Sequence, residues 1–128
     1  MSNYNSEYNN VVWVDIPVAD LDRSIAFYSA VLGTPVSKEE MEGFTFGVFM
    51  HEQGNGGCLV LKEGEISSSQ GILVYMNVNG RIRDAVAQVD ANGGNVMNEI
   101  HSIGPHGFRA IVIDSEGNRL ALHSETDA

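Results

Sequence analysis

The chain contains an internal repeat in which residues 11–57 correspond to residues 71–117 at a constant shift of sixty positions. Both halves follow the same order: an apolar strand pattern, a helical pattern, a glycine and three further short apolar runs. The identical pairs under this shift are Val14/Val74, Val18/Val78, Arg23/Arg83, Gly33/Gly93, Val36/Val96, Glu39/Glu99, Gly47/Gly107 and Gly57/Gly117. Such a repeat predicts a fold built from two copies of one supersecondary unit.

The first half reads as one strand, one helix and three further strands. Residues 10–17 are rich in β-branched side chains and end at a proline, where we expect the strand to stop. Asp20 is placed to cap a helix, and Gly33 supplies the left-handed residue with which helices commonly end. The apolar stripe of this helix is Leu21, Ile25, Tyr28 and Leu32. The later strands are expected at 35–39, 44–50 and 58–62.

The second half repeats this order. A strand is expected at 72–78 and a helix at 81–92, with Ile82, Val86 and Val89 facing inward. The remaining strands are expected at 95–101, 108–114 and 119–124, the last two joined by turn-forming residues.

These elements predict an α+β fold that forms a single compact domain. Two tandem β-α-β-β-β modules span residues 10–62 and 71–124, and a linker occupies residues 63–70. We expect their strands to form a curved, mostly antiparallel mixed sheet. Because each helix can cover only one face of a sheet, the other face is expected to form a central cleft where a ligand binds.

The composition favours a small soluble domain and disfavours several kinds of partner. A chain of 128 residues with 43% apolar content can bury the core of one domain. The formal net charge of −10, from 17 acids and 7 bases, makes nucleic acid and anionic membranes poor partners. A neutral or cationic small molecule suits this charge better, although an acidic surface is also an ordinary source of solubility.

The sequence pattern also predicts a cytoplasmic location. No apolar run reaches the roughly twenty residues of a membrane span, and residues 1–10 do not read as a secretory signal. The one cysteine, Cys58, cannot form an internal disulfide, and we expect it to be a small buried apolar side chain.

Three segments carry a resemblance to a known family: VDIPVADLDRSIAFYSAVLG at 14–33, VYMNVNGRIRDAV at 74–86 and IDSEGNRLALHS at 113–124. They resemble the vicinal oxygen chelate superfamily, which includes glyoxalase I, extradiol dioxygenases and bleomycin resistance proteins. The closing segment is most similar to a subgroup described as predicted enzymes related to lactoylglutathione lyase. The resemblance implies the glyoxalase/bleomycin resistance fold.

The same resemblance bears on metal binding. Catalytic members of the family hold a divalent cation through His, Gln or Glu on the first and last strands of each module. In this chain the matching positions are Trp13, Leu61 (or its neighbour Val60), Leu73 and Ala121, and none of these side chains can ligate a metal. The resemblance therefore implies a chain with no metal site and no cofactor at these positions.

Strand parity then defines the lining of the cleft. Side chains two apart on a strand share a face, so His123 accompanies Ala121 and Asp15 accompanies Trp13. The complete lining predicted in this way is Trp13, Asp15, Tyr75, Asn77 and His123. Such an aromatic and polar lining suits a flat or amphipathic ligand, and His123 with Asp15 forms a candidate acid/base pair. The structural alternatives are core packing for Trp13 and a strand-end position for His123.

Arg109 and the other histidines are further candidates. Arg109 follows an expected turn at 104–107 over the cleft mouth, and it can pair with a ligand carboxylate or with one of the protein's own acids. His51, His101 and His106 invite a metal interpretation. The five-residue spacing of His101 and His106 fits neither a helical nor a strand pair, however, and a metal site needs several converging ligands.

Together these features predict a metal-independent family member that binds a small organic molecule and catalyses a proton-transfer or lyase-type step. One alternative is a non-catalytic protein that sequesters a drug or metabolite, as bleomycin resistance proteins do. A second is a metal-dependent enzyme like lactoylglutathione lyase whose ligands lie elsewhere. Because family modules commonly pair across a dimer, the resemblance also implies a homodimer.

Overall fold

The computed structural model describes residues 10–128 and has the predicted order of elements in both halves. The first module comprises β1 (Asp15–Val18), α1 (Leu21–Leu32), β2 (Val36–Met41), β3 (Phe44–Phe49) and β4 (Cys58–Leu61). The second comprises β5 (Val74–Asn77), α2 (Ile82–Ala91), β6 (Asn95–Ser102), β7 (Phe108–Ile113) and β8 (Arg119–Ser124). Two short 3-10 helices are η1 (Glu63–Glu65) and η2 (Gly104–His106).

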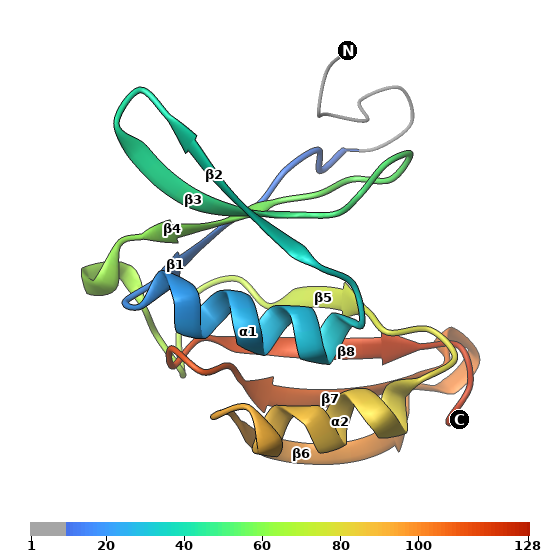
Figure 1. Ribbon diagram of the computed structural model, residues 1–128. Helices are drawn as coiled ribbons and strands as arrows, with labels where there is room; N and C mark the ends of the chain where they lie inside the picture. Colours follow the sequence, from blue (N-terminus) through green and yellow to red (C-terminus); the bar gives the residue numbers. More distant parts are fainter. Residues whose placement is uncertain (1–9) are drawn as a thin grey trace.

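Each module forms its own four-stranded sheet, in the order β1-β4-β3-β2 for the first and β5-β8-β7-β6 for the second. In both sheets the first and last strands of the module are parallel neighbours, and the other neighbours are antiparallel. Figure 1 shows the first sheet above, the second below, and α1 between them. The predicted α+β class and mostly antiparallel mixed pairing are confirmed, and each module contributes one four-stranded sheet.

β1 is shorter than predicted, and it continues past its proline. Its ladder begins at Asp15 because the partner of this residue, Cys58, is the first residue of β4. Upstream of it the Cys58 N–H donates to the carbonyl oxygen of Val14 at 2.9 Å. β1 is an edge strand, which tolerates the missing N–H of Pro17, so the strand runs on to Val18.

α1 begins and ends where the sequence predicts but buries a wider face. Asp20 caps it by accepting a 3.0 Å hydrogen bond from the N–H three residues on, and Gly33 ends it in the left-handed conformation with φ of 73°. Ile25 of the predicted stripe is partly buried, whereas Phe27 and Val31 outside the stripe are fully buried. A single stripe underestimates the burial because α1 contacts both modules.

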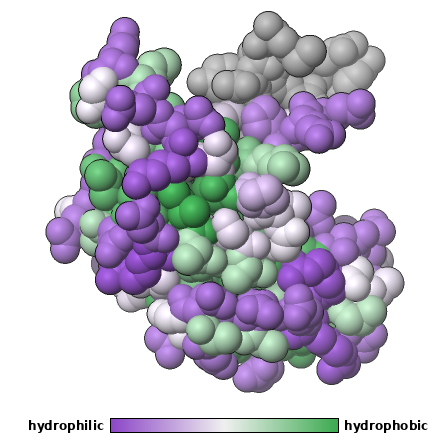
Figure 2. Space-filling view, viewed as in Figure 1, coloured by the Kyte–Doolittle hydropathy of each residue, from purple (hydrophilic) through white to green (hydrophobic). Residues whose placement is uncertain are grey.

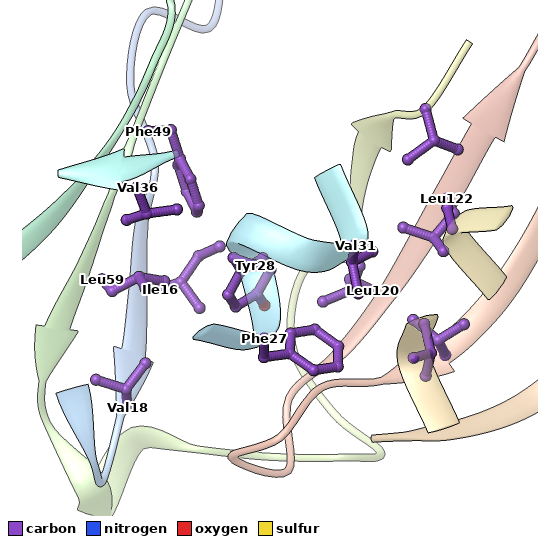
Figure 3. Close-up of a cluster of buried hydrophobic side chains, with 14 of the residues drawn as sticks. Ile16, Val18, Phe27, Tyr28, Val31, Val36, Phe49, Leu59, Leu120 and Leu122 are labelled. Carbon is purple, nitrogen blue, oxygen red and sulfur yellow. The ribbon is translucent and has the colours of Figure 1, made fainter. Parts of the chain in front are cut away.

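The two modules share one core with α1 at its centre. Figure 3 shows Tyr28 of α1 beside Ile16 of the first sheet, whereas Val31 lies next to Leu120 of the second. Residues of both sheets and of both helices belong to the same buried cluster. Removal of this apolar surface from water, worth about 25 cal/mol per Å², holds the modules together.

The turn between β7 and β8 adds polar contacts to this junction. One carboxylate oxygen of Glu116 accepts hydrogen bonds from the backbone N–H groups of Ala19 and Asp20, at 3.0 and 2.8 Å. These groups lie at the N-terminus of α1, where negative charge is favoured. Nδ2 of Asn118 donates to the carbonyl oxygen of Pro17 at 2.7 Å. The closing segment that carries the family resemblance therefore binds the first module.

The surface is mixed in polarity. In Figure 2 most of the visible face is hydrophilic, and hydrophobic residues form a patch near its middle. Met41 and Phe44, on either side of the β2–β3 turn, are 62% and 74% exposed.

No helix within residues 10–128 is long and apolar enough to cross a membrane.

Candidate functional site

The second sheet is covered by α2 on one face and open on the other. On β8, Leu122 is buried in the core, and strand alternation turns Ala121 and His123 to the opposite face. The register pairs Tyr75 of β5 with Ala121, and Asn77 with His123. Three residues of the predicted lining therefore share this open face: Tyr75, Asn77 and His123.

Four polar side chains form a row across the open face, one from each strand. The register aligns Asn77 with His123, His123 with Arg109, and Arg109 with His101. Their strands are neighbours in the order β5-β8-β7-β6. The backbones of successive residues in the row are therefore about 4.8 Å apart, the usual distance between neighbouring strands. We refer to Asn77, His123, Arg109 and His101 as the polar row.

Arg109 is held in place by two neutral groups. Its Nε donates to Nε2 of His101 at 3.0 Å, and its Nη1 donates to the hydroxyl oxygen of Tyr75 at 2.5 Å. His101 can accept this bond because its Nδ1 donates to the carbonyl oxygen of Glu99 at 2.8 Å, which places the ring proton on Nδ1. The guanidinium is thus oriented without being neutralised.

His123 has a defined tautomer in its neutral form. Its Nε2 lies 2.7 Å from the carbonyl oxygen of His106, and a carbonyl oxygen can only accept, so Nε2 carries the proton. Nδ1 is then the basic nitrogen of the ring. The His106 carbonyl belongs to η2, and the turn predicted at 104–107 is therefore the element that orients His123.

A pocket of about 530 Å³ lies over this end of the open face. Its volume is in the range of small-molecule sites. The residues that line it come from β5, β7, β8 and the segment around η2: Tyr75, Met76, Asn77, Ile103, His106, Arg109 and His123. Polar groups from several elements converge on one space, as recognition of a small molecule requires.

The remaining lining candidates, Trp13 and Asp15, lie on the first module. The ring of Trp13 makes an edge-on contact with His51, with centroids 5.5 Å apart. A carboxylate oxygen of Asp15 accepts a hydrogen bond from the Cys58 thiol at 3.2 Å. Burial raises the pKa of this thiol to about 11; a hydrogen bond involving Trp13 opposes the rise, and Asp15 adds to it.

Within one chain, the side chains of Asp15 and His123 bond other partners, the Cys58 thiol and the carbonyl oxygen of His106. β1 meets the start of β8 where Asn118 binds the carbonyl oxygen of Pro17. His123 is five residues further along β8, or roughly 16 Å at the usual rise of a strand. The predicted acid/base pair is therefore not assembled among the described residues of a single chain.

The first sheet has an open face of its own, with a groove of about 730 Å³. Acidic and apolar side chains predominate there, and His51 contributes one ring. The residues of this groove are Pro35, Ser37, Glu39, Glu40, Met41, Phe46, Val48, Phe49, Met50, His51 and Glu52. The two open faces thus differ in charge: the first carries carboxylates, and the second carries an arginine and histidines.

The residues that the structure describes do not bring together a set of side chains suited to holding a divalent cation. Within residues 10–128, no three His, Cys, Asp or Glu side chains lie close enough together to hold a metal ion. The positions expected to ligate are hydrocarbon or indole, and one of them, Ala121, is completely buried. His101 directs both ring nitrogens to protein partners, which leaves neither for a metal.

Two features of the site were not predicted from the sequence. The lining includes Met76 and Ile103, for which strand parity gives no signal. The sequence suggests a metal-binding role for His101, but in the structure it is the acceptor that orients Arg109. A regular pairing of β6 with β7 would have allowed the sequence to predict that His101 lies beside Arg109. The β6–β7 register is irregular, however, so this pairing cannot be read from the sequence.

Comparisons with known proteins place the chain in a family. Residues 10–122 match the Glyoxalase/Bleomycin resistance protein/Dioxygenase superfamily. A glyoxylase-like domain-containing protein from Didymella fabae is 30% identical over 128 residues, covering 90% of this chain and 93% of that protein.

Solved structures have the same fold at low sequence identity. A glyoxalase-related enzyme from Fulvimarina pelagi has a TM-score of 0.67 and 16% identity, covering 91% of this chain and 88% of that chain. A genomically encoded fosfomycin resistance protein from Listeria monocytogenes has a TM-score of 0.68 and 12% identity, covering 91% and 93%. Because the family match spans residues 10–122 and a relative covering 90% of the chain is 30% identical, the chain belongs to the Glyoxalase/Bleomycin resistance protein/Dioxygenase superfamily.

Proposed function

We propose that this protein binds a small organic molecule on the open face of its second sheet, without the aid of a metal ion. The observation that carries the proposal is the pocket of about 530 Å³ into which Tyr75, Asn77, Arg109 and His123 converge from three strands. Side chains fixed by strands and by hydrogen bonds are preorganised for binding. The sequence supports metal independence, since the side chains at the expected ligand positions, Trp13, Leu61, Leu73 and Ala121, offer no donor atom for a metal.

The chemistry that suits this site is proton transfer, in a lyase or isomerase type of reaction. His123 is the candidate general base because its proton lies on Nε2, bound to the carbonyl of His106, and Nδ1 is its basic nitrogen. Arg109 is placed one strand away, where it can stabilise negative charge that develops on a substrate oxygen.

A non-catalytic sequestering protein is the second candidate, and one observation favours it. Asp15, the proposed partner of His123, binds the Cys58 thiol instead. A histidine without a carboxylate partner is a weaker catalyst than a paired one, but it remains an adequate binding group. The structural neighbour from Listeria monocytogenes is named as a fosfomycin resistance protein, and so a resistance role is known on this fold.

We also propose that the protein is a homodimer in which the first sheet of one copy faces the second sheet of the other. The acidic groove with Glu39, Glu40 and Glu52 is complementary in charge to the face with Arg109 and the histidines. Such pairing would cover the exposed Met41 and Phe44. It would also allow Asp15 of one copy to approach His123 of the other. Light scattering tests this directly, and a monomer at micromolar concentration would contradict it.

A thermal-shift screen with thioesters, dicarbonyls and glycopeptide drugs tests the proposed function. A ligand that raises Tm and is turned over, with turnover lost in His123→Ala or Asp15→Asn, would identify an enzyme. Binding without turnover would identify a sequestering protein. Uptake of Zn²⁺, Ni²⁺ or Mn²⁺ at a tight stoichiometric site, measured by elemental analysis, would instead support a metal-dependent lyase.

A further inference from the structure

The basic side chains of this acidic protein are not paired uniformly. Of its 7 lysines and arginines, five form ion pairs with carboxylates. The paired ones are Arg23, Lys38, Lys62, Arg81 and Arg83. Within residues 10–128, Arg109 and Arg119 form none, although the chain has 17 acids. An arginine that forms no ion pair within the protein can form one with an anionic ligand.

Both unpaired arginines belong to the open face of the second sheet. Arg109 is a member of the polar row, and Arg119 shares the strand parity of Ala121 and His123 on β8. The Nε atom of Arg119 is buried with no hydrogen-bond partner. Arg119 lies four residues from His123, roughly 13 Å along the strand. Because this is longer than the Debye length of about 8–10 Å, salt screens most of the effect of its charge on the polar row.

The contacts of Arg109 preserve its capacity to bind an anion. An arginine has five N–H donors, and the bonds to His101 and Tyr75 use two of them. Both acceptors are neutral, so the positive charge is not cancelled. The three remaining donors form a planar group of the kind that matches the two oxygens of a carboxylate.

Apolar surface lies next to this charge. Ile103 lines the same pocket, and Tyr75, whose hydroxyl binds the guanidinium, is 47% exposed. A ligand with one anionic end and a flat apolar body can therefore satisfy both parts of the site at once.

We propose that the second sheet's open face is a carboxylate-recognition site for small organic acids, with Arg109 as the principal anchor and Tyr75 and His101 as its positioning residues. This rests on the proposed function and names the class of ligand. The net charge of the chain by itself favours cationic ligands, but Arg109 places a positive charge in this pocket that no carboxylate among the described residues pairs with.

The test is a titration of ¹⁵N-labelled protein with four compounds of one shape: benzoate, phenylphosphonate, benzamide and benzamidinium. Benzoate is expected to shift the amide signals of β5, β7, β8 and η2, and the neutral and cationic analogues are expected to bind at least tenfold more weakly. Phenylphosphonate separates carboxylate from phosphonate recognition. Equal or tighter binding of the phosphonate would overturn the assignment to organic acids.

The variant Arg109→Met is expected to weaken benzoate binding by about 10-fold to 100-fold, the effect of losing hydrogen bonds to a charged group. Arg109→Lys keeps the charge but loses the planar fork, and it should recover only part of the affinity. Arg83→Met is the matched control, because it removes one positive charge from the same module at an exposed ion pair on α2. It should leave benzoate binding unchanged.

Several outcomes would overturn this inference, and they differ from failure of the proposed function. If benzamide or benzamidinium bound the same face as tightly as benzoate, small-molecule binding would stand and the carboxylate assignment would fall. If Arg109→Met weakened self-association while benzoate caused no shift, the anchor would serve a carboxylate of a second copy. If none of the compounds in this set or in the thermal-shift screen bound, the proposed function itself would fail.

Discussion

Nε and Nη2 of Arg23 lie 2.7 and 2.8 Å from the two carboxylate oxygens of Glu116, a bidentate pair between α1 of the first module and the β7–β8 turn of the second. The Glu116 side chain is completely buried, whereas that of Arg23 is 52% exposed. Solvent screens the exposed arginine, so much of the stabilisation comes from the backbone N–H groups of Ala19 and Asp20 that bind the same carboxylate.

Glu116→Gln is therefore expected to lower the free energy of unfolding by about 1 kcal/mol, because the bonds lose their charged acceptor. Urea unfolding at pH 7 measures this. Asp22→Asn, which removes the carboxylate of an ion pair in which both side chains are more than half exposed, is the control and should change stability little. Equal stability of Glu116→Gln and the unmodified protein would contradict the assigned role.

The same carboxylate gives the junction a pH dependence. Burial alone would raise the pKa of Glu116, but hydrogen bonds from Arg23, Asp20, Ser115 and Ala19 outweigh it and lower the pKa from 4.5 to about 2. A carboxyl group with a depressed folded-state pKa contributes stability that is complete above its unfolded value and is lost as the pH falls. This contribution should therefore disappear between pH 4.5 and 2. Urea unfolding at several pH values should show a smaller acid-induced loss in Glu116→Gln; an unchanged loss would argue against it.

Tyr28→Phe tests a second contact across the junction. The Tyr28 hydroxyl donates to the carboxylate of Asp114 at 2.5 Å, and both side chains are buried. Phenylalanine retains the ring contacts with Phe27 and Phe49. We therefore expect the free energy of unfolding to fall by about 1–2 kcal/mol, and this loss measures the contribution of the hydrogen bond. Tyr75→Phe, on the exposed face, serves as the control for stability. A loss below about 0.5 kcal/mol in Tyr28→Phe would show that the bond contributes little.

Gly94→Ala tests the close approach of the two modules. A Cβ at this position would lie 2.5 Å from the carbonyl oxygen of Ile113 and 2.7 Å from Cε1 of Phe27, so the backbone or α1 must move. We expect a cost of about 1–3 kcal/mol in thermal or urea unfolding. Gly64→Ala is the matched control, because a Cβ there meets nothing within 4 Å. Similar stabilities of the two variants would contradict the packing described here.

The thiol of Cys58 should react slowly in the folded protein. Burial raises its pKa from 9.0 to about 11, so the reactive thiolate is on the order of 100-fold scarcer at pH 8 than in an unperturbed cysteine. A disulfide reagent added to native protein, with protein unfolded in urea as the reference, measures the difference. Equal rates would mean that the thiol is neither buried nor bonded to Asp15.

The sequence predicts the fold well because both halves show the same order of strand and helix patterns, so each half supports the interpretation of the other. Strand parity also predicts that Tyr75, Asn77 and His123 share a face, since alternation is a local property of a strand. The position of Asp15 relative to His123 could not be obtained in this way. That position depends on how the modules pack, which is decided by α1 and by the contacts of Glu116 and Asn118 with the first module.

The environment of Arg109 was also beyond sequence reasoning. The sequence leaves open whether this residue pairs with a ligand or with one of the protein's acids. The choice depends on the register that places it beside His123 and His101, and on the tautomer that Glu99 imposes on His101. The burial of Phe27 and Val31 was missed for a related reason, because a helix between two modules needs more than one apolar stripe.

The most direct test of the account is the benzoate titration of ¹⁵N-labelled, chelator-treated protein, repeated with one equivalent of Zn²⁺. We predict the same affinity with and without the metal, and shifts confined to β5, β7, β8 and η2. Stoichiometric uptake of Zn²⁺ together with benzoate binding that requires it would contradict the account.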